Sequence, residues 1–135
     1  MATLQDVCDF LKQAKTYHLA TVDGDQPRVR PFGASEIIDG KLYIQTGAGK
    51  DVFKQIIANP KVEIEATVGA DWLRIAGTLV DDNRVEAKKA MLDLVPSLRK
   101  LGYSEDDDNT RVLYFEHGVA TFSSLAGKPG WTFEW

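Results

Sequence analysis

The alternation of apolar and polar residues along the chain predicts a protein built mainly from short strands. Val62, Ile64 and Ala66 alternate with Glu63 and Glu65. This period of two indicates a strand with one buried face. Shorter or less regular runs of the same kind predict strands at 17–22, 28–38, 41–46, 72–80, 111–116 and 119–124. The sequence therefore predicts seven strands.

Three segments carry their apolar residues at helical spacing instead. They are residues 3–14, residues 50–58, and a segment that follows Asp81 or Asp82 and runs to Val95. Thr3 is a residue type that caps helix N-termini, and either aspartate can cap the third helix in the same way. The pattern predicts helix, three strands, helix, two strands, helix, two strands.

Short connections indicate how the strands pair. Asp39-Gly40 supplies the positive φ values of a two-residue hairpin turn. Hairpin-sized links favour an antiparallel sheet, and a sheet of short strands removes its exposed edges by curling into a barrel. The helices would cover its openings. A length of 135 residues without a repeat or a biased linker predicts one domain, residues 1–135.

Two segments near the C-terminus have distinctive composition. Residues 104–109 are acidic and polar, which is typical of a solvated loop or a short capped turn. Trp131, Phe133 and Trp135 crowd the last five positions, and such aromatic clusters mark contact surfaces. We expect this tail to pack on its own barrel or on a partner.

Composition and charge narrow the class of protein. Sixteen basic and twenty acidic residues give a formal net charge of -4, which disfavours a nucleic-acid partner. No apolar stretch has the length of a signal peptide or a membrane span, so we expect a cytoplasmic protein without a membrane partner. Cys8 lies on the apolar stripe of the first predicted helix and is interpreted as a core residue, and the two histidines lack metal-ligand spacing.

Basic residues between positions 28 and 50 are the first candidates for chemistry. Arg28 and Arg30 are two positions apart on a strand and project to one face, where their guanidinium groups repel each other. An exposed strand face tolerates this arrangement, and so does a bound anion lying between the two groups. Both interpretations fit the sequence.

Lys50 is a second candidate because a cation at a helix start is unfavourable. The preceding turn, residues 46–49, offers backbone N–H groups and the Thr46 hydroxyl, which suit a phosphate. The alternative places Lys50 outside the helix, with Asp51 as the cap. Gly47-Ala-Gly49 completes neither a dinucleotide fingerprint nor a Walker motif. Together with the arginines, Lys50 indicates a small ligand that carries a phosphate.

Trp72 and Arg74 share one face of a predicted strand. An aromatic ring beside a cation is typical of a stacked surface pair, and it also suits the wall of a pocket for a planar ligand. The sequence leaves both interpretations open.

Three stretches in this order carry a family resemblance: residues 17–32, residues 40–46, and residues 50–62 with their closing Asn-Pro-Lys-Val. In them the chain resembles the FMN-binding split-barrel proteins related to pyridoxamine 5'-phosphate oxidase, and especially the small nitroimidazole-resistance-type and general-stress-type members. The resemblance implies a mainly β fold, a Greek-key split antiparallel barrel with peripheral helices. It also implies FMN as cofactor and a homodimer with a flavin at each interface cleft.

The resemblance also implies a set of cofactor-binding residues. Arg30, with Pro31 and Phe32, would line the flavin edge and help to hold the phosphate. Gln45 and Thr46 would contact the flavin or its phosphate, and Lys50 would bind the phosphate. The complete expected set is Arg28, Arg30, Pro31, Phe32, Gln45, Thr46, Lys50 and Trp72.

The expected function is transfer of electrons from a reduced donor, such as a reduced nicotinamide, through FMN to a small acceptor such as a nitroaromatic or a quinone. No side chain is assigned a catalytic role. The chain lacks the longer C-terminal region of true pyridoxamine phosphate oxidases, so we do not expect that activity. The main alternative is a non-catalytic stress or sensor protein that binds flavin or haem. An oligonucleotide-binding barrel is disfavoured by the net charge and by the acidic run 105–108.

Overall fold

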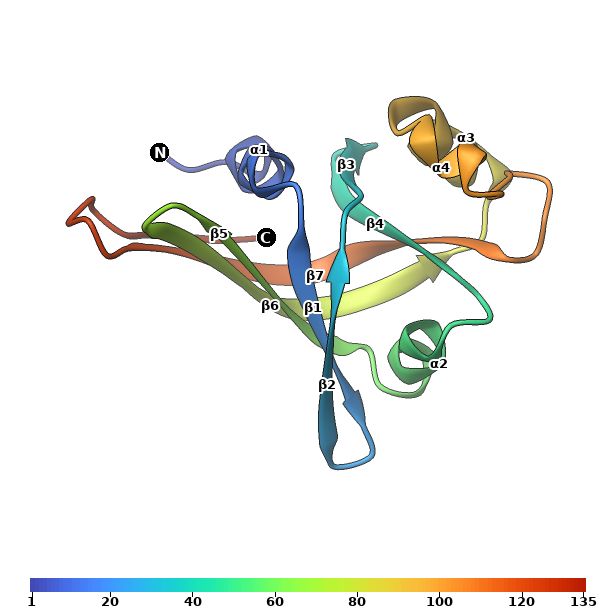
Figure 1. Cartoon of the computed structure of the whole chain (residues 1–135), viewed down its shortest axis with the longest axis horizontal. Coiled ribbons are helices and arrows are strands. Elements are labelled where there is room, and N and C mark those ends of the chain that lie inside the picture. The colour runs from blue at the N-terminus through green and yellow to red at the C-terminus, as the bar shows by residue number, and fades with distance from the viewer.

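The computed structural model describes residues 1–135 and contains one strongly curled sheet of eight antiparallel strands with four helices around it (Figure 1). The strands are β1 (Tyr17–Asp23), β2 (Gln26–Phe32), β3 (Ser35–Ile38), β4 (Lys41–Gly47), β5 (Lys61–Val68), β6 (Asp71–Asp82), β7 (Thr110–Ser124) and β8 (Trp131–Glu134). The helices are α1 (Leu4–Ala14), α2 (Asp51–Ala58), α3 (Val85–Leu94) and α4 (Ser97–Lys100).

The strand order confirms the predicted split antiparallel barrel. Neighbours run β2-β1-β5-β6-β7-β4-β3, and β8 adds to β7 outside this path. The two ends of the path, β2 and β3, follow each other in the chain but do not pair. The sheet therefore closes around its interior with a split between β2 and β3.

Strand β4 is buried on both faces because it separates two hydrophobic clusters. Leu42 and Ile44 belong to the larger cluster inside the barrel, while Tyr43, on the opposite face, belongs to a smaller cluster with Met91 and Leu92 of α3. Alternate residues of a strand point to opposite sides, which explains how one strand serves both clusters. The end of β4 is thereby fixed from two sides.

Helix α1 packs on the sheet through its predicted apolar stripe. The Thr3 hydroxyl accepts a hydrogen bond from the Asp6 backbone N–H, and the Asp6 carboxylate accepts one from the Thr3 N–H, so the predicted cap is confirmed as a capping box. Cys8 is 1% exposed, and burial raises the pKa of its thiol to about 11. Cys8 is therefore a core residue, as predicted.

The predicted long strand 28–38 is wrong, because the chain breaks it at Gly33-Ala34. Before the break β2 pairs with β1, and after it β3 pairs with β4 at the other end of the sheet. The Tyr17 hydroxyl donates a hydrogen bond of 2.5 Å to the Ala34 carbonyl at this corner. Strand β2 has no buried residue, whereas Ser35, Glu36 and Ile38 of β3 are buried, so the two segments differ in burial as well as in pairing.

The two predicted C-terminal strands are in fact one strand, β7. It pairs with β6 along its length, and a register shift between Thr78 and Leu79 leaves Glu116 as an extra residue. The aromatic tail packs on its own barrel as β8, and Trp135 exchanges two backbone hydrogen bonds with Gly118. The first of the two interpretations of the tail is therefore confirmed.

The segment between β6 and β7 differs most from the prediction. Asp81 and Asp82 lie within β6, so neither caps α3, whose N-cap is Arg84. Helix α4 was not predicted. Residues 104–109 form an ordered turn in which the Asp107 carboxylate accepts hydrogen bonds from two backbone N–H groups. No helix of the structure combines the length and the apolar character needed to cross a membrane.

Candidate functional site

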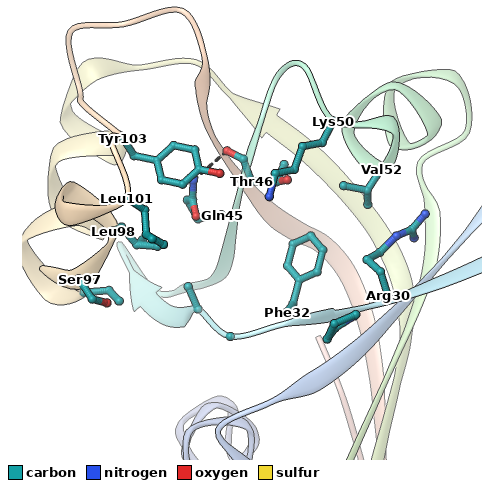
Figure 2. Close-up of a pocket in the computed structure, with 14 residues that line it drawn as sticks. Arg30, Phe32, Gln45, Thr46, Lys50, Val52, Ser97, Leu98, Leu101 and Tyr103 are labelled. Carbon is teal, nitrogen blue, oxygen red and sulfur yellow. Dashed lines mark hydrogen bonds between the residues drawn. The ribbon is translucent and has the colours of Figure 1, made fainter.

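A cavity of about 380 Å³ lies beside the split of the barrel (Figure 2). Four parts of the chain meet there: the corner between β2 and β3, the end of β4, the start of α2, and the segment 95–103 that includes α4. A volume of this size lies in the range of small-molecule and cofactor sites.

The cavity brings together six of the eight residues predicted from the sequence. They are Arg30, Pro31, Phe32, Gln45, Thr46 and Lys50. Arg28 lines an adjoining hollow of about 540 Å³, which it shares with Arg30 and Lys50. Residues from two sheet ends and a helix start therefore converge on one place.

Trp72 is the predicted residue that the cavity does not include. It lies on β6, where the Arg74 guanidinium stands 5.1 Å from the centre of its ring. In one chain this is a stacked pair on the sheet. A flavin contact by Trp72 stays a prediction that requires a second copy of the chain.

Arg30 is held in place by neighbouring elements. One terminal nitrogen donates hydrogen bonds to the Leu19 carbonyl at 3.1 Å and the Thr21 hydroxyl at 2.7 Å, and the other donates to Gln55 Oε1 of α2 at 2.6 Å. Burial, and then the charge of Arg28, lower the pKa of Arg30. An arginine remains charged under these conditions, so Arg30 presents a fixed positive charge.

Arg28 differs from Arg30 in having a partner of opposite charge. Its Nε lies 3.1 Å from the carboxylate of Asp23, and the side chain is half exposed. This pair offsets part of the repulsion between the two arginines. The structure therefore makes Arg28 the weaker candidate for an anion, because part of its charge is already neutralised.

Lys50 stands at the N-cap of α2, and no side chain caps this helix. The alternative in which Asp51 is the cap is therefore wrong. Lys50 forms no ion pair, and Figure 2 shows its amino group directed into the cavity. The backbone N–H groups of Gly49, Asp51 and Val52 have no hydrogen-bond partner in the chain. Free N–H groups at a helix start beside a free ammonium group suit an anion.

Gln45 and Thr46 add polar groups to the wall of the cavity. Both side chains are buried, at 6% and 3% exposure. Gln45 Nε2 donates to the Thr46 carbonyl at 2.8 Å, whereas Gln45 Oε1 and the Thr46 hydroxyl have no hydrogen-bond partner in the chain. Neither oxygen is used by another group of the chain, so both are free to form a hydrogen bond with a ligand in the cavity.

The opposite wall was missed by the sequence analysis. It consists of the side chains Val95, Ser97, Leu98, Leu101 and Tyr103, which surround α4. Leu98 is buried, while Leu101 is 74% exposed at the cavity edge. Leu98 and Leu101 are three positions apart, a helical spacing that gives a weak signal in so short a segment.

The cavity thus has a cationic end and an apolar end. Arg30, Lys50 and the start of α2 form the first, and Phe32 with Val95, Leu98 and Leu101 forms the second. A molecule with an anionic arm and a flat, largely apolar body matches this distribution of charge. Gln45 and Thr46 lie between the two ends, on β4.

Comparisons with known proteins place the chain in a family and confirm its fold. A family model described as pyridoxamine 5'-phosphate oxidase matches residues 4–116. A NimC/NimA family protein from Clostridium acetobutylicum is 44% identical, with 97% of this chain and 92% of that chain covered and a TM-score of 0.91. No match was found among curated proteins.

Two more distant structures share the fold. One is a pyridoxamine 5'-phosphate oxidase-related, FMN-binding protein from Nostoc punctiforme, 16% identical over 99% of this chain and 90% of that chain, with a TM-score of 0.72. The other is General Stress Protein 26 from Bacillus anthracis, 17% identical over 96% and 98%, with a TM-score of 0.74.

Proposed function

This chain belongs to the pyridoxamine 5'-phosphate oxidase family, and from that premise we propose that it is an FMN-binding oxidoreductase. The observation that carries the proposal is the uncapped start of α2 beside Arg30 and the unpaired Lys50, at one end of a cavity whose other end is apolar. The FMN phosphate fits the first end and the flavin ring the second.

The chain's own residues bind and orient the cofactor. Lys50 and the free N–H groups of α2 hold the phosphate, and Arg30 adds a second charge that its hydrogen bonds keep fixed. Gln45 and Thr46 supply hydrogen bonds from β4, and Phe32 gives the ring an apolar wall. Bound flavin supplies the redox chemistry, the passage of electrons from a reduced donor to a small acceptor.

The first test is the identity of the cofactor. We expect the purified protein to release FMN, identified by mass spectrometry, or to quench the fluorescence of added FMN. The absence of both the flavin spectrum and FMN binding would overturn the proposal.

The second test separates phosphate binding from ring binding. Lys50→Ala is expected to weaken FMN by about 1.5–3 kcal/mol, the scale of a hydrogen bond between charged groups, and to leave riboflavin nearly unchanged. Arg30→Ala is expected to act in the same direction. Lys54→Ala is the matched control, because Lys54 is an exposed lysine of the same helix outside the cavity. Equal losses for FMN and riboflavin would contradict the assignment of the phosphate site.

Haem is the alternative cofactor. Haem iron takes His, Cys, Met or Tyr as ligands, and of these residue types the cavity contains only Tyr103. A Soret band in the purified protein would favour haem. Turnover separates an enzyme from a storage or sensor protein: persistent inactivity of the FMN-loaded protein with reduced nicotinamide and either a nitroaromatic or a quinone would favour the non-catalytic alternative.

We also propose that the protein is a homodimer whose second copy covers the flavin. Two features support this: the cavity has an exposed edge at Leu101, and β2 is an edge strand, paired on one side only, that carries the exposed Val29 next to the cationic hollow. Burial of exposed apolar side chains in a dimer interface would contribute favourable free energy to association.

A further inference from the structure

Tyr103 lines the cavity, but the proposed function assigns it no role. Its ring forms part of the wall around α4, and its side chain is half-buried. The hydroxyl has no hydrogen-bond partner in the chain, and Figure 2 shows it directed toward Thr46. A phenol is a strong donor, so a half-buried hydroxyl that faces a cavity without a partner is a candidate ligand contact.

The backbone fixes where this hydroxyl lies. Helix α4 ends in a Schellman motif, in which the Tyr103 N–H donates to the Leu98 carbonyl at 3.2 Å and the Gly102 N–H donates to the Arg99 carbonyl at 3.0 Å. The motif needs a left-handed residue, and Gly102 supplies it with a φ of 96°. Tyr103 is therefore placed by the helix end and not by a bond of its own side chain.

The segments on both sides of Tyr103 are also held. The Ser104 N–H donates to the Thr110 hydroxyl at 2.9 Å, and Thr110 is fully buried. Arg99 of α4 pairs with Glu105 at 2.6 Å and with Asp93 at 2.8 Å. These bonds restrain the segment before any ligand arrives, which lowers the entropy cost of using Tyr103 as a contact.

Gly47 brings Tyr103 to the phosphate end of the cavity. A Cβ on Gly47 would lie 3.4 Å from the Tyr103 hydroxyl oxygen and 3.2 Å from Asn109 Oδ1, so the absence of a side chain allows this close approach. Gly47 also begins the turn that leads into α2, and its carbonyl accepts a hydrogen bond from the Lys50 N–H at 3.1 Å. The Tyr103 hydroxyl thus lies at the same turn as Lys50.

We propose that the Tyr103 hydroxyl donates a hydrogen bond to the FMN phosphate, from the side of the cavity opposite Arg30. The proposal rests on the proposed function, because it assumes FMN as the ligand. The segment after α4 then acts as a third holder of the phosphate, together with Lys50 and the start of α2. Discrimination between FMN and the unphosphorylated flavin depends in part on this segment.

Binding of FMN and of riboflavin to the apoprotein tests the assignment by fluorescence quenching. Tyr103→Phe keeps the ring and removes the hydroxyl. We expect about ten-fold weaker FMN binding, the scale of one hydrogen bond to a charged group, with riboflavin affinity unchanged. The control is Tyr114→Phe, because the Tyr114 hydroxyl on β7 also lacks a partner and lines a different hollow. The apoprotein melting temperature should not change, because Tyr103→Phe breaks no hydrogen bond within the chain.

The outcomes separate this inference from the proposed function. Unchanged FMN affinity in Tyr103→Phe, with the Lys50→Ala loss still present, would overturn the inference and leave the proposed function standing. Equal losses of FMN and riboflavin would also overturn it, because the hydroxyl would then contact the ring or the ribityl chain. A wild-type protein that binds no FMN would overturn both.

Discussion

Asp82 is a buried carboxylate at the end of β6 that two side chains hold in its charged form. The Arg84 guanidinium donates two hydrogen bonds of 2.9 Å, and the Tyr43 hydroxyl donates one of 2.7 Å. Arg84 first, and then Tyr43, lower the pKa of Asp82 to about 2 against the opposing effect of burial. Burial of Tyr43 itself, followed by its contact with Asp82, raises the pKa of Tyr43 to about 12.

Acid should therefore destabilise the protein partly through Asp82. A carboxyl has a pKa of about 3.9 when unfolded, so the stabilising effect is complete above about pH 5 and is lost as the pH falls through 2. Asp82→Asn should cost about 1–2 kcal/mol at pH 7, a discounted figure because Arg84 is half exposed. Urea unfolding at several pH values checks this. A cost that stays constant between pH 4 and pH 2 would contradict it.

Gly118 has no side chain, and this leaves room for the ring of Trp135 at the C-terminus. A Cβ there would lie 2.4 Å from the ring of Trp135. Gly118→Ala should destabilise the protein by about 1–3 kcal/mol through overpacking, and should release β8 to faster hydrogen exchange. Gly33→Ala is the control, because its Cβ would meet only a carbonyl at 3.9 Å. Equal unfolding free energies for the two variants would refute the expectation.

Site residues could be predicted from the sequence where the signal came from a neighbouring position in the chain. Lys50 was predictable because a cation at a helix start conflicts with the helix dipole, and Arg30 because it faces Arg28 on one strand. Tyr103 carries no such local conflict. Its place depends on Gly102 and on contact with Gly47, more than fifty positions away, and that contact exists only after the sheet has closed.

At the scale of elements, α4 is a four-residue helix that depends on its ends. Its Schellman motif needs the left-handed conformation of Gly102, which costs a residue with a Cβ about 1–2 kcal/mol. The same motif sets the position of Tyr103 in the cavity wall. We therefore expect Gly102 to affect both stability and FMN affinity.

Gly102→Ala should lower both the free energy of unfolding, by about 1–2 kcal/mol, and the affinity for FMN. Gly69→Ala is the matched variant, since Gly69 has a φ of 60° in the turn between β5 and β6. It should lose similar stability and keep its FMN affinity. Thermal unfolding and FMN titration on both proteins make the comparison. FMN affinity that is lost equally in the two variants would show that α4 has no special part in binding.

Most elements were predictable because hydrophobic periodicity is a local signal. The strands β1, β4, β5 and β6 and the helices α1, α2 and α3 all follow from it. The break between β2 and β3 does not, because it depends on which strand each one pairs with. The single strand β7 was missed for the same reason, since its pairing with β6 continues past His117-Gly118.

At the scale of the whole molecule, the open cavity and the free outer edge of β2 both favour a second copy. Strand β2 has mostly exposed residues, with Val29 67% exposed. An edge strand with an apolar residue in water is a common site of association. The net charge of the chain is -4, but Arg28, Arg30 and Lys50 form a local positive region that attracts anions.

Light scattering should give a mass of twice the 15.0 kDa of one chain. Val29→Asp should shift the mass toward one chain, because it places a charge on the β2 edge. Leu125→Asp is the control, since Leu125 is 87% exposed in the turn between β7 and β8. A monomeric wild-type protein, or equal effects of the two variants, would contradict dimerisation through β2.

The split of the barrel also bears on how a ligand enters. Strands β2 and β3 are joined through Gly33-Ala34, yet no ladder of hydrogen bonds crosses between them. The cavity lies at this seam. Widening the seam would break no ladder of backbone hydrogen bonds, so we expect a bulky ligand to enter there with the rest of the sheet unchanged.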